Sequence, residues 1–483
     1  HFHNAKTPFF LLHSASVPGQ WSIIGLPDTT SEIITHSLDS PKSYTVEIDK
    51  QITRHCLNSG ESIWNVFGKK MELKYIPREQ FKLNSDLPFL GGYLGLVSYE
   101  EGRHLLLDSL ESFCNDDTPD FKLVYIDRFI VINNDSKEWH VMSIRDTSKS
   151  ENLTWCLEMK QTILNSKRIE MDTVPFSVQE LDPTIPITYE LPSKEIYSKQ
   201  FDQCQKLLHS GDSYELCLTA TLKARVSNEV KLWDVYKILA LRRNPSPYSC
   251  FFEFDDVTLI SSSPERFLSW KDDPENTGDK LVELRPIKGT VKNTPEMTRE
   301  IATETLKTPK EMGENLMIVD LIRHDLHQFT PSVKVKQLMT VEEYKTVFQL
   351  VSVIQGNLRG SLDKKYYGLD VLSDSLPPGS MTGAPKKRSV ELLQAIEAQQ
   401  TTSLKGGRRG IYSGVVGYWS VTDDSDWSVI IRSLFHYKDD KHNTADLDLW
   451  RFGAGGAITV LSDKEGEWNE MYLKLDSTLQ AFK

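Results

Sequence analysis

A succession of hydrophobic segments from residue 193 to the C-terminus limits the fold more than any other property of this chain. Short runs rich in β-branched and aromatic residues, which favour strands, alternate with longer stretches that have the apolar period of a helix. We predict strands over 215–223, 249–254, 257–263, 281–287, 411–420, 427–437 and 447–461, and helices over 193–210, 230–243, 296–308, 311–328, 385–398 and 466–480. Many strands that lie far apart in the sequence predict an α+β fold, with large packed β-sheets and helices outside.

The chain is predicted to have two parts. Before residue 190, short apolar segments lie among polar loops, and residues 88–99 and 121–132 favour strands. Residues 171–195 are rich in proline and polar side chains, which is typical of a connector. We therefore expect an N-terminal subregion over 1–190 and a C-terminal region over 191–483.

Composition excludes several classes of partner. The 483 residues carry a formal net charge of −12, with 39% hydrophobic and 26% charged residues. A negative chain is a poor match for nucleic acid or an anionic membrane. We find no apolar run long enough to span a bilayer and no signal peptide. The six cysteines form no C-x-x-C pair, so we expect reduced thiols and a cytoplasmic protein.

One lysine is placed unusually for a surface residue. Residues 284–290 read LRPIKGT, so Lys288 is expected in a turn between Pro286 and Gly289. Proline fixes the backbone and glycine permits left-handed geometry. Desolvation of a lysine held in this way would lower its pKa and make the amine a nucleophile or a base. Most turn lysines are solvated, so this segment alone leaves both interpretations open.

Acidic residues occur at helical spacing near the C-terminus. Glu467, Glu470 and Lys474 would share one face of the helix predicted over 466–480. They could form an ordinary solvated face with a Glu–Lys pair, or they could hold a cation.

A second acidic segment has an apolar centre. Glu314, Asp320, Arg323 and Asp325 surround it, and buried carboxylates need a partner or a cation. Oxygen ligands without His or Cys clusters suit Mg²⁺. The alternative is a buried network that pairs Arg323 with Asp320 or Asp325.

Three segments could bind an anion. Arg432 lies inside an apolar strand, where it needs either a structural ion pair or a ligand carboxylate. Residues 453–456 read GAGG after a predicted strand and could offer backbone N–H groups to an oxyanion. Residues 379–386 enter a predicted helix near Pro385, whose N-terminus could face an anion. We find no nucleotide fingerprint and no P-loop.

Taken together, these segments resemble the chorismate-utilising enzymes, which include anthranilate synthase component I, aminodeoxychorismate synthase component I, and the isochorismate and salicylate synthases. The resemblance is strong from about residue 195 to the end and weak through residues 10–14 and 87–92. It rests on SPERF at 263–267, RPIKGT at 285–290, ENLMIVD at 314–320, SMTGAPK at 380–386, the strands of Tyr412 and Arg432, and the helix of Glu467, Glu470 and Lys474. It implies an anthranilate synthase component I-like fold with the active site in a cleft.

Two segments indicate a branch of this family. The pentapeptide PIKGT around Lys288 resembles the aminodeoxychorismate synthases, whereas anthranilate synthases carry a small residue at that position. Residues 211–219 resemble the eukaryotic bifunctional type, in which the synthase follows a glutamine amidotransferase domain. The implied reaction converts chorismate and ammonia to 4-amino-4-deoxychorismate, on the route to 4-aminobenzoate and folate.

The source of ammonia and the branch leave alternatives. Because the chain has no G-x-C-x-G glutaminase nucleophile, ammonia is expected from an amidotransferase domain or partner. Isochorismate synthase, salicylate synthase and anthranilate synthase component I activities remain alternatives, as does a catalytically silent binding subunit.

The resemblance also implies roles for residues. Lys288 would form a covalent adduct at C2 of the ring, and Glu265 would act as general acid to the C4 hydroxyl. Mg²⁺ would be held by Glu314 and Glu470, with Glu467 close by. The substrate would be bound by Tyr412, Arg432, Lys474, Gly453, Gly455 and Gly456, with Thr382 near the ring.

A few positions differ from the family or add to it. Gln349 stands where many relatives carry His, His324 where Asn is common, and Glu215 where Gln is common. Ser14 resembles the part of the relatives that binds tryptophan, so a tryptophan pocket is possible in the N-terminal subregion.

Overall fold

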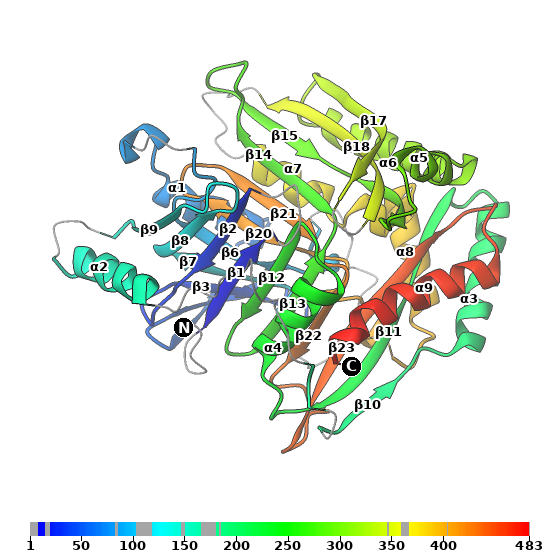
Figure 1. The fold of residues 1–483 in the computed structure, drawn as a ribbon, viewed down its shortest axis with the longest axis horizontal. Helices are drawn as coiled ribbons and strands as arrows, with labels where there is room; N and C mark the ends of the chain where they lie inside the picture. The colour runs from blue at the N-terminus through cyan, green and yellow to red at the C-terminus, as the bar shows by residue number, and fades with distance from the viewer. Residues whose placement is uncertain are drawn as a thin grey trace.

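The computed structural model describes residues 8–14, 20–82, 86–102, 118–145, 150–165, 180–182, 185–344, 347–358, 367–402 and 404–482. Two large antiparallel sheets form the body of the molecule (Figure 1). The first is 11-stranded, and its order is β10 (Ile187–Glu190), β11 (Glu215–Ser227), β23 (Leu447–Ile458), β22 (Ser433–Tyr437), β13 (Val257–Ser263), β12 (Tyr248–Glu253), β1 (Phe9–His13), β2 (Trp21–Gly25), β8 (Arg128–Asn133) and β9 (Trp139–Ser143), with β19 (Gly383–Ala384) paired to β11.

The second sheet is 12-stranded and carries the predicted lysine segment. Its order is β16 (Ile287–Lys292), β18 (Val347–Leu358), β15 (Lys280–Leu284), β14 (Arg266–Asp272), β21 (Ser425–Val429), β20 (Val415–Ser420), β6 (Gly92–Val97), β7 (Phe121–Ile126), β3 (Ile33–His36), β4 (Ser43–Ile48) and β5 (Gln51–Cys56), with β17 (Val333–Glu343) paired to β18. The predicted α+β fold of packed sheets is confirmed.

Helices cover the sheets at one end of the molecule. In Figure 1, α9 (Lys464–Leu479) runs across β11 and β23, and α3 (Lys194–His209) lies beside it. The helices α5 (Arg299–Leu306) and α6 (Pro309–His327) lie beside β17 and β18, and α8 (Lys386–Glu397) packs on β11. The other helices are α1 (Ile63–Lys74), α2 (Ser150–Asn165), α4 (Leu232–Lys237) and α7 (Tyr367–Ser375).

The main core lies between the two sheets. Phe10 and Phe252 from the first sheet and Tyr93 and Trp419 from the second are fully buried in one hydrophobic cluster. Aromatic side chains bury large apolar areas, so this layer supplies much of the stability. A second cluster lies under α3 and α9 and includes the buried Trp450.

Both sheets combine strands from the two sides of residue 190. In the first sheet β1 pairs with β12, and in the second β6 pairs with β20. Residues 1–190 are therefore woven into the same two sheets as the rest of the chain. Residues 171–179 and 183–184 of the predicted connector lie outside the described residues, and β10 lies within its second half.

The predicted elements agree with the structure where one hydrophobic period is sustained. The strand over 257–263 is β13, and the helix over 311–328 is α6 with small differences at its ends. The prediction of single strands over 121–132 and 427–437 is wrong, because each segment is two strands that belong to different sheets. The helix over 230–243 changes from α-helix to π-helix at Ile238.

Candidate active site

Lys288 lies in a strand and not in a turn. Residues 287–292 pair with β18 as β16, and a bulge between Lys288 and Thr290 absorbs Gly289. Gly289 has a φ of +78°, so the predicted left-handed backbone is confirmed. The prediction of a turn was wrong because the polar segment pairs with the long neighbouring strand β18. A bulge often re-aims a side chain next to an active site.

The Lys288 side chain is buried among carboxylates. Its exposed fraction is 10%, so the solvated interpretation is wrong. Its Nζ lies 2.8 Å from Glu215 Oε1 and 3.8 Å from Glu314 Oε2. Burial lowers the pKa of the amine, but the charges of Glu215 and Glu314 outweigh burial and raise the pKa above its ordinary value. The prediction of a lowered pKa is thus wrong for the protein without substrate.

Glu265 is poised to be an acid near neutral pH. It lies between β13 and β14 with 6% of its surface exposed. Burial raises its pKa to about 7, against the opposing effects of Ser380 and Lys288. A carboxyl group of this pKa is protonated in a large fraction of molecules at pH 7, as a general acid must be.

A second cation lies between two of the predicted metal ligands. Lys310, at the start of α6, has its Nζ 2.8 Å from Glu467 Oε1 and 3.8 Å from Glu314 Oε1. Burial raises the pKa of Glu314 to about 7, against the charge of Lys288. Within the described residues Glu314 Oε1 is buried without a hydrogen-bond partner. One carboxylate oxygen is therefore left in need of a donor or a cation.

The donor set suits a hard cation, although it is not assembled. In the part of the chain that the structure describes, no group of three or more His, Cys, Asp or Glu side chains is arranged to hold a metal ion. Glu470 instead pairs with Lys474 at 2.7 Å, as in the ordinary interpretation of this helix face. Carboxylate oxygens are nevertheless the ligands Mg²⁺ prefers, and Glu314 Oε1 accepts no hydrogen bond within the described residues, so the residues fit the ion.

Among the residues that the structure describes, Arg432 forms no ion pair, unlike other arginines of the core. It adopts a φ of +53°, and its Nη1 donates to Ser477 Oγ at 2.8 Å. Arg409 and Arg451, in contrast, pair with Glu397 and Asp440. Of the two alternatives for Arg432, the structural ion pair is therefore wrong for the described residues. The strain lies in the backbone of Arg432. Its half-buried guanidinium has one neutral partner and retains donors for a ligand carboxylate.

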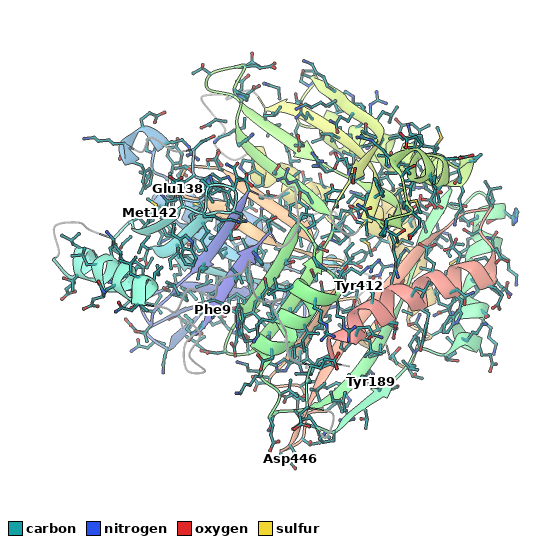
Figure 2. The ribbon with its side chains drawn as sticks, viewed as in Figure 1. Phe9, Glu138, Met142, Tyr189, Tyr412 and Asp446 are labelled. Carbon is teal, nitrogen blue, oxygen red and sulfur yellow. The ribbon has the colours of Figure 1, made fainter. Side chains whose placement is uncertain are left out.

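Tyr412 and the glycines of β23 lie against each other. Tyr412 is buried near the centre of the molecule (Figure 2), and a Cβ on Gly453 would lie 2.3 Å from its ring. Gly453, Gly455 and Gly456 lie within β23, which confirms the strand predicted over 447–461 and corrects the description of the glycines as following a strand. The segment is strand because β11 pairs with it along its length.

One edge of β23 is open beside these glycines. Lys474 Nζ donates to the carbonyl of Gly455 at 2.9 Å, and β22 pairs with β23 only from residue 450 to 452. Since the N–H and C=O of one strand residue point to the same edge, the amides of Gly453 and Gly455 also face this edge. By the same alternation Gly456 faces β11.

The remaining predicted residues have mainly structural contacts. Thr382 is fully buried, and its hydroxyl donates to the carbonyl of Gly379 at 3.0 Å. Arg323 pairs with Asp320 on an exposed surface, so the expected burial of that pair is wrong. Asp325 pairs instead with Lys386 at 2.6 Å.

Ser14 lies apart from Lys288, in the lining of a separate cavity. The cavity has a volume of about 690 Å³ and is bordered by aromatic residues that include Trp21 and Tyr248. Polar groups such as the Arg266–Asp426 pair also face it.

Sequence reasoning gave no role to Glu215 or Lys310. Glu215 begins β11 directly after the Gly211–Tyr214 turn. The sequence feature that could have indicated its role is that Glu215 stands where Gln is common in the family. Lys310 lies four residues before Glu314 on α6, which puts both side chains on one helix face.

The fold and this carboxylate-lined lysine define a class of enzyme. A family model described as chorismate binding enzyme matches residues 28–480, and the chain belongs to this family. In structure the chain is similar to anthranilate synthase component I from Streptococcus pneumoniae, with a TM-score of 0.72 and 24% identity over 96% of this chain and 93% of that one. It is also similar to the menaquinone-specific isochorismate synthase of Escherichia coli, with a TM-score of 0.63 and 17% identity over 100% and 90%.

Curated relatives indicate the branch. The chain is 42% identical to the aminodeoxychorismate synthase of Saccharomyces cerevisiae over 96% of this chain and 60% of the relative. It is 31% identical to aminodeoxychorismate synthase component 1 of Escherichia coli over 83% and 79%. The chain thus spans about 60% of the yeast relative's length, and the resemblance seen in the sequence is confirmed. Among the described residues no helix is long and apolar enough to cross a bilayer.

Proposed function

We propose that this chain converts chorismate and ammonia to 4-amino-4-deoxychorismate through a covalent adduct on Lys288, in the synthesis of 4-aminobenzoate and folate. The observation that carries the proposal is the burial of Lys288 between the Glu215 and Glu314 carboxylates. The names of the curated relatives support the same substrate and product.

The first half of the reaction uses three side chains. The Lys288 ammonium passes a proton to Glu215, and the free amine forms a bond to C2 of the ring. The ring double bonds shift, and the C4–O bond breaks. Glu265 gives its proton to the departing oxygen, which leaves as water. Hydroxide is a poor leaving group, so a protonated Glu265 is chemically required.

The second half returns each proton. Ammonia forms a bond to C4, the double bonds shift back, and the bond between C2 and the Lys288 nitrogen breaks. The new ammonium at C4 gives a proton to the Glu265 carboxylate, and the released amine recovers its proton from Glu215. The net change is substitution of hydroxyl by amine, and the enzyme is unchanged.

The substrate carboxylates need cationic partners. We propose that Arg432, Tyr412 and Lys474, with the amides of Gly453 and Gly455, bind them near Thr382. The amide of Gly456 faces β11, so we leave it out of the proposed binding groups. Glu314, Glu467 and Glu470 would hold Mg²⁺, which supplies positive charge to a ring carboxylate when bound. Lys310 must then give up its position between Glu314 and Glu467.

Ammonia, location and a second ligand complete the proposal. We propose that ammonia comes from a glutamine amidotransferase domain or partner, because the chain spans only part of its yeast relative and shows no glutaminase nucleophile. The cytoplasm is the proposed location.

The cavity beside Ser14 is proposed to bind tryptophan, which titration calorimetry with this amino acid would test.

Product identity tests the central proposal. The protein is incubated with chorismate, Mg²⁺ and an ammonium salt, and the product is identified by NMR and mass spectrometry. An amine at C4 with the enolpyruvyl group retained supports the proposal. A hydroxyl at C2 would indicate an isochorismate synthase, salicylate a salicylate synthase, and anthranilate an anthranilate synthase; each would overturn the proposal.

A further inference from the structure

A small cavity lies beside Glu265. It is bordered by Glu265 and Arg266, by Asp325 of α6, by Ser375 and Ser380, and by Lys386 of α8, with apolar residues closing the rest. The space open to the centre of a water molecule is about 10 Å³. This is at the lower limit for one molecule of that size.

Two hydroxyl groups in the lining lack partners. Ser375 is 1% exposed, and within the described ranges neither its Oγ nor the buried Oγ of Ser380 has a group in hydrogen-bonding geometry. Ser380 is nevertheless near enough to the Glu265 carboxylate to lower its pKa. A buried hydroxyl without a partner costs about 1–3 kcal/mol. Since Ser380 already acts on Glu265, it is the Ser375 hydroxyl that indicates a missing hydrogen-bonding molecule.

The charged groups around the cavity are largely satisfied by each other. Lys386 Nζ donates to Asp325 Oδ2 at 2.6 Å and to the Ser375 carbonyl at 2.7 Å, which leaves one of its three donors. Arg266 is turned to Asp426 at 2.7 Å.

Lys288 of β16 is the charged group that acts on Glu265, and it is not among the residues that line the cavity. The unsatisfied groups that line the cavity are thus hydroxyls and one N–H of Lys386. Because the charge of Lys386 is paired with Asp325, these groups suit a small neutral ligand better than an ion.

We propose that this cavity binds one small hydrogen-bonding molecule, water or ammonia, that bridges Glu265 to Ser375 and Ser380. The molecule donates to one carboxyl oxygen of Glu265 and leaves the other oxygen to face the ring. Ser375 and Ser380 are then positioning residues that act on the general acid through the bound molecule. Water and ammonia share the size and the donor chemistry that the site requires.

A crystal structure tests the binding without reference to the reaction. At high resolution the wild-type protein is expected to show one electron-density peak within hydrogen-bonding distance of Glu265, Ser375 and Ser380. In Ser375→Ala and Ser380→Ala the peak should weaken or disappear. Absence of the peak from the wild-type protein would overturn the proposal, whatever reaction the enzyme catalyses.

A pH profile tests the coupling to Glu265, and this part rests on the proposed function. Because the bound molecule donates to the charged form of Glu265, its loss raises the pKa of that group. In the plot of kcat against pH, the fall in kcat on the alkaline side should shift to higher pH by about 0.5 pH unit in Ser375→Ala. Within the described ranges the Ser375 hydroxyl forms no direct hydrogen bond with Glu265, so only a bridging molecule transmits this shift. An unshifted fall in kcat overturns the bridge.

Two further comparisons complete the design. Ser373→Ala is the matched control, because Ser373 is buried on the same helix and donates to the Asp370 carbonyl away from the cavity. The alkaline fall in kcat of this variant should occur at the same pH as in the wild type. Melting temperatures check that each variant is folded. A raised KM for ammonium in Ser375→Ala identifies the bound molecule as ammonia, and an unchanged KM identifies it as water; both support the site.

Discussion

The Lys288 amine and the Glu215 carboxylate form an ion pair 2.8 Å long in the interior of the protein, with Glu215 fully buried. The pair has two opposing effects. It raises the pKa of the amine, which keeps the proposed nucleophile protonated before substrate binds, and it places a carboxylate against that amine. In the proposed mechanism, nucleophilic attack therefore depends on moving one proton from Lys288 to Glu215.

Replacing Glu215 should separate these two effects. In Glu215→Gln the main charge that raises the pKa of Lys288 is gone, so its pKa falls. At pH 8 Lys288 should react faster with a small amine-modifying reagent, while turnover of chorismate falls by roughly 100-fold because the proton acceptor is lost. Peptide mass spectrometry and steady-state kinetics measure the two quantities. Turnover that rises together with reactivity would contradict a role for Glu215 as acceptor.

Lys288→Ala should remove the covalent route. We expect turnover with saturating ammonium to fall by roughly 10³-fold or more, because effects of a catalytic nucleophile are of this size. Wild-type protein incubated with chorismate without ammonium should carry added mass on the Lys288 peptide. Lys292→Ala, at an exposed position of the same strand, is the control and should behave as wild type. Near-normal turnover by the Lys288 variant excludes the adduct.

Glu265 should link activity to pH and to stability. Its pKa of about 7 predicts that kcat falls as pH rises above 7, since the general acid loses its proton. The same raised pKa means that ionised Glu265 destabilises the folded protein above pH 7, by on the order of 3 kcal/mol. Glu265→Gln should thus be nearly inactive, yet melt at a higher temperature than wild type at pH 8 and not at pH 5. Equal melting temperatures at pH 8 would show that the carboxyl group is not buried as described.

The proposed Mg²⁺ site should respond in opposite directions to two substitutions on α6. Glu314→Gln removes a ligand oxygen and should weaken Mg²⁺ binding at least about tenfold. Lys310→Met removes the cation that lies between Glu314 and Glu467, and should strengthen Mg²⁺ binding. Titration calorimetry without substrate measures both. If Lys310→Met binds Mg²⁺ more weakly, the lysine supports the site and does not compete for it.

Arg432→Gln should affect substrate binding more than folding. Loss of a hydrogen-bonded carboxylate contact of about 2 kcal/mol corresponds to a roughly 30-fold higher KM for chorismate. Stability should change little, because Arg432 forms no ion pair within the described residues. Arg451→Gln is the contrasting variant, since Arg451 pairs with Asp440 and its loss should lower the melting temperature while KM is kept. An unchanged KM in Arg432→Gln would remove the arginine from the binding site.

The sequence predicted the parts of this molecule that local pattern and motif determine. Strand β13, helix α6 and the carboxylates of α9 follow from hydrophobic period and spacing. The environment of Lys288 could not be predicted in this way. Glu215 is 73 residues away in the chain and meets Lys288 because β11 and β16 belong to different sheets that converge there. The direction of the pKa change depends on that encounter.

Other misjudged features have similar causes. The turn predicted around Lys288 is a strand, because its pairing comes from β18, which is distant in the sequence. Lys310 received no role because its partner Glu467 is 157 residues away. The hydrophobic period of a short segment does not show which distant segment it pairs with.

The pairing of β1 with β12 and of β6 with β20 bears on how the molecule can be divided. If the chain were cut near residue 190, each fragment would present unpaired backbone edges and half of an aromatic interior to water, so each alone should aggregate. Mixed during refolding, the two fragments should instead recover one another. The two fragments should therefore work as a split-protein pair that regains its fold on mixing. The C-terminal fragment produced alone should not fold.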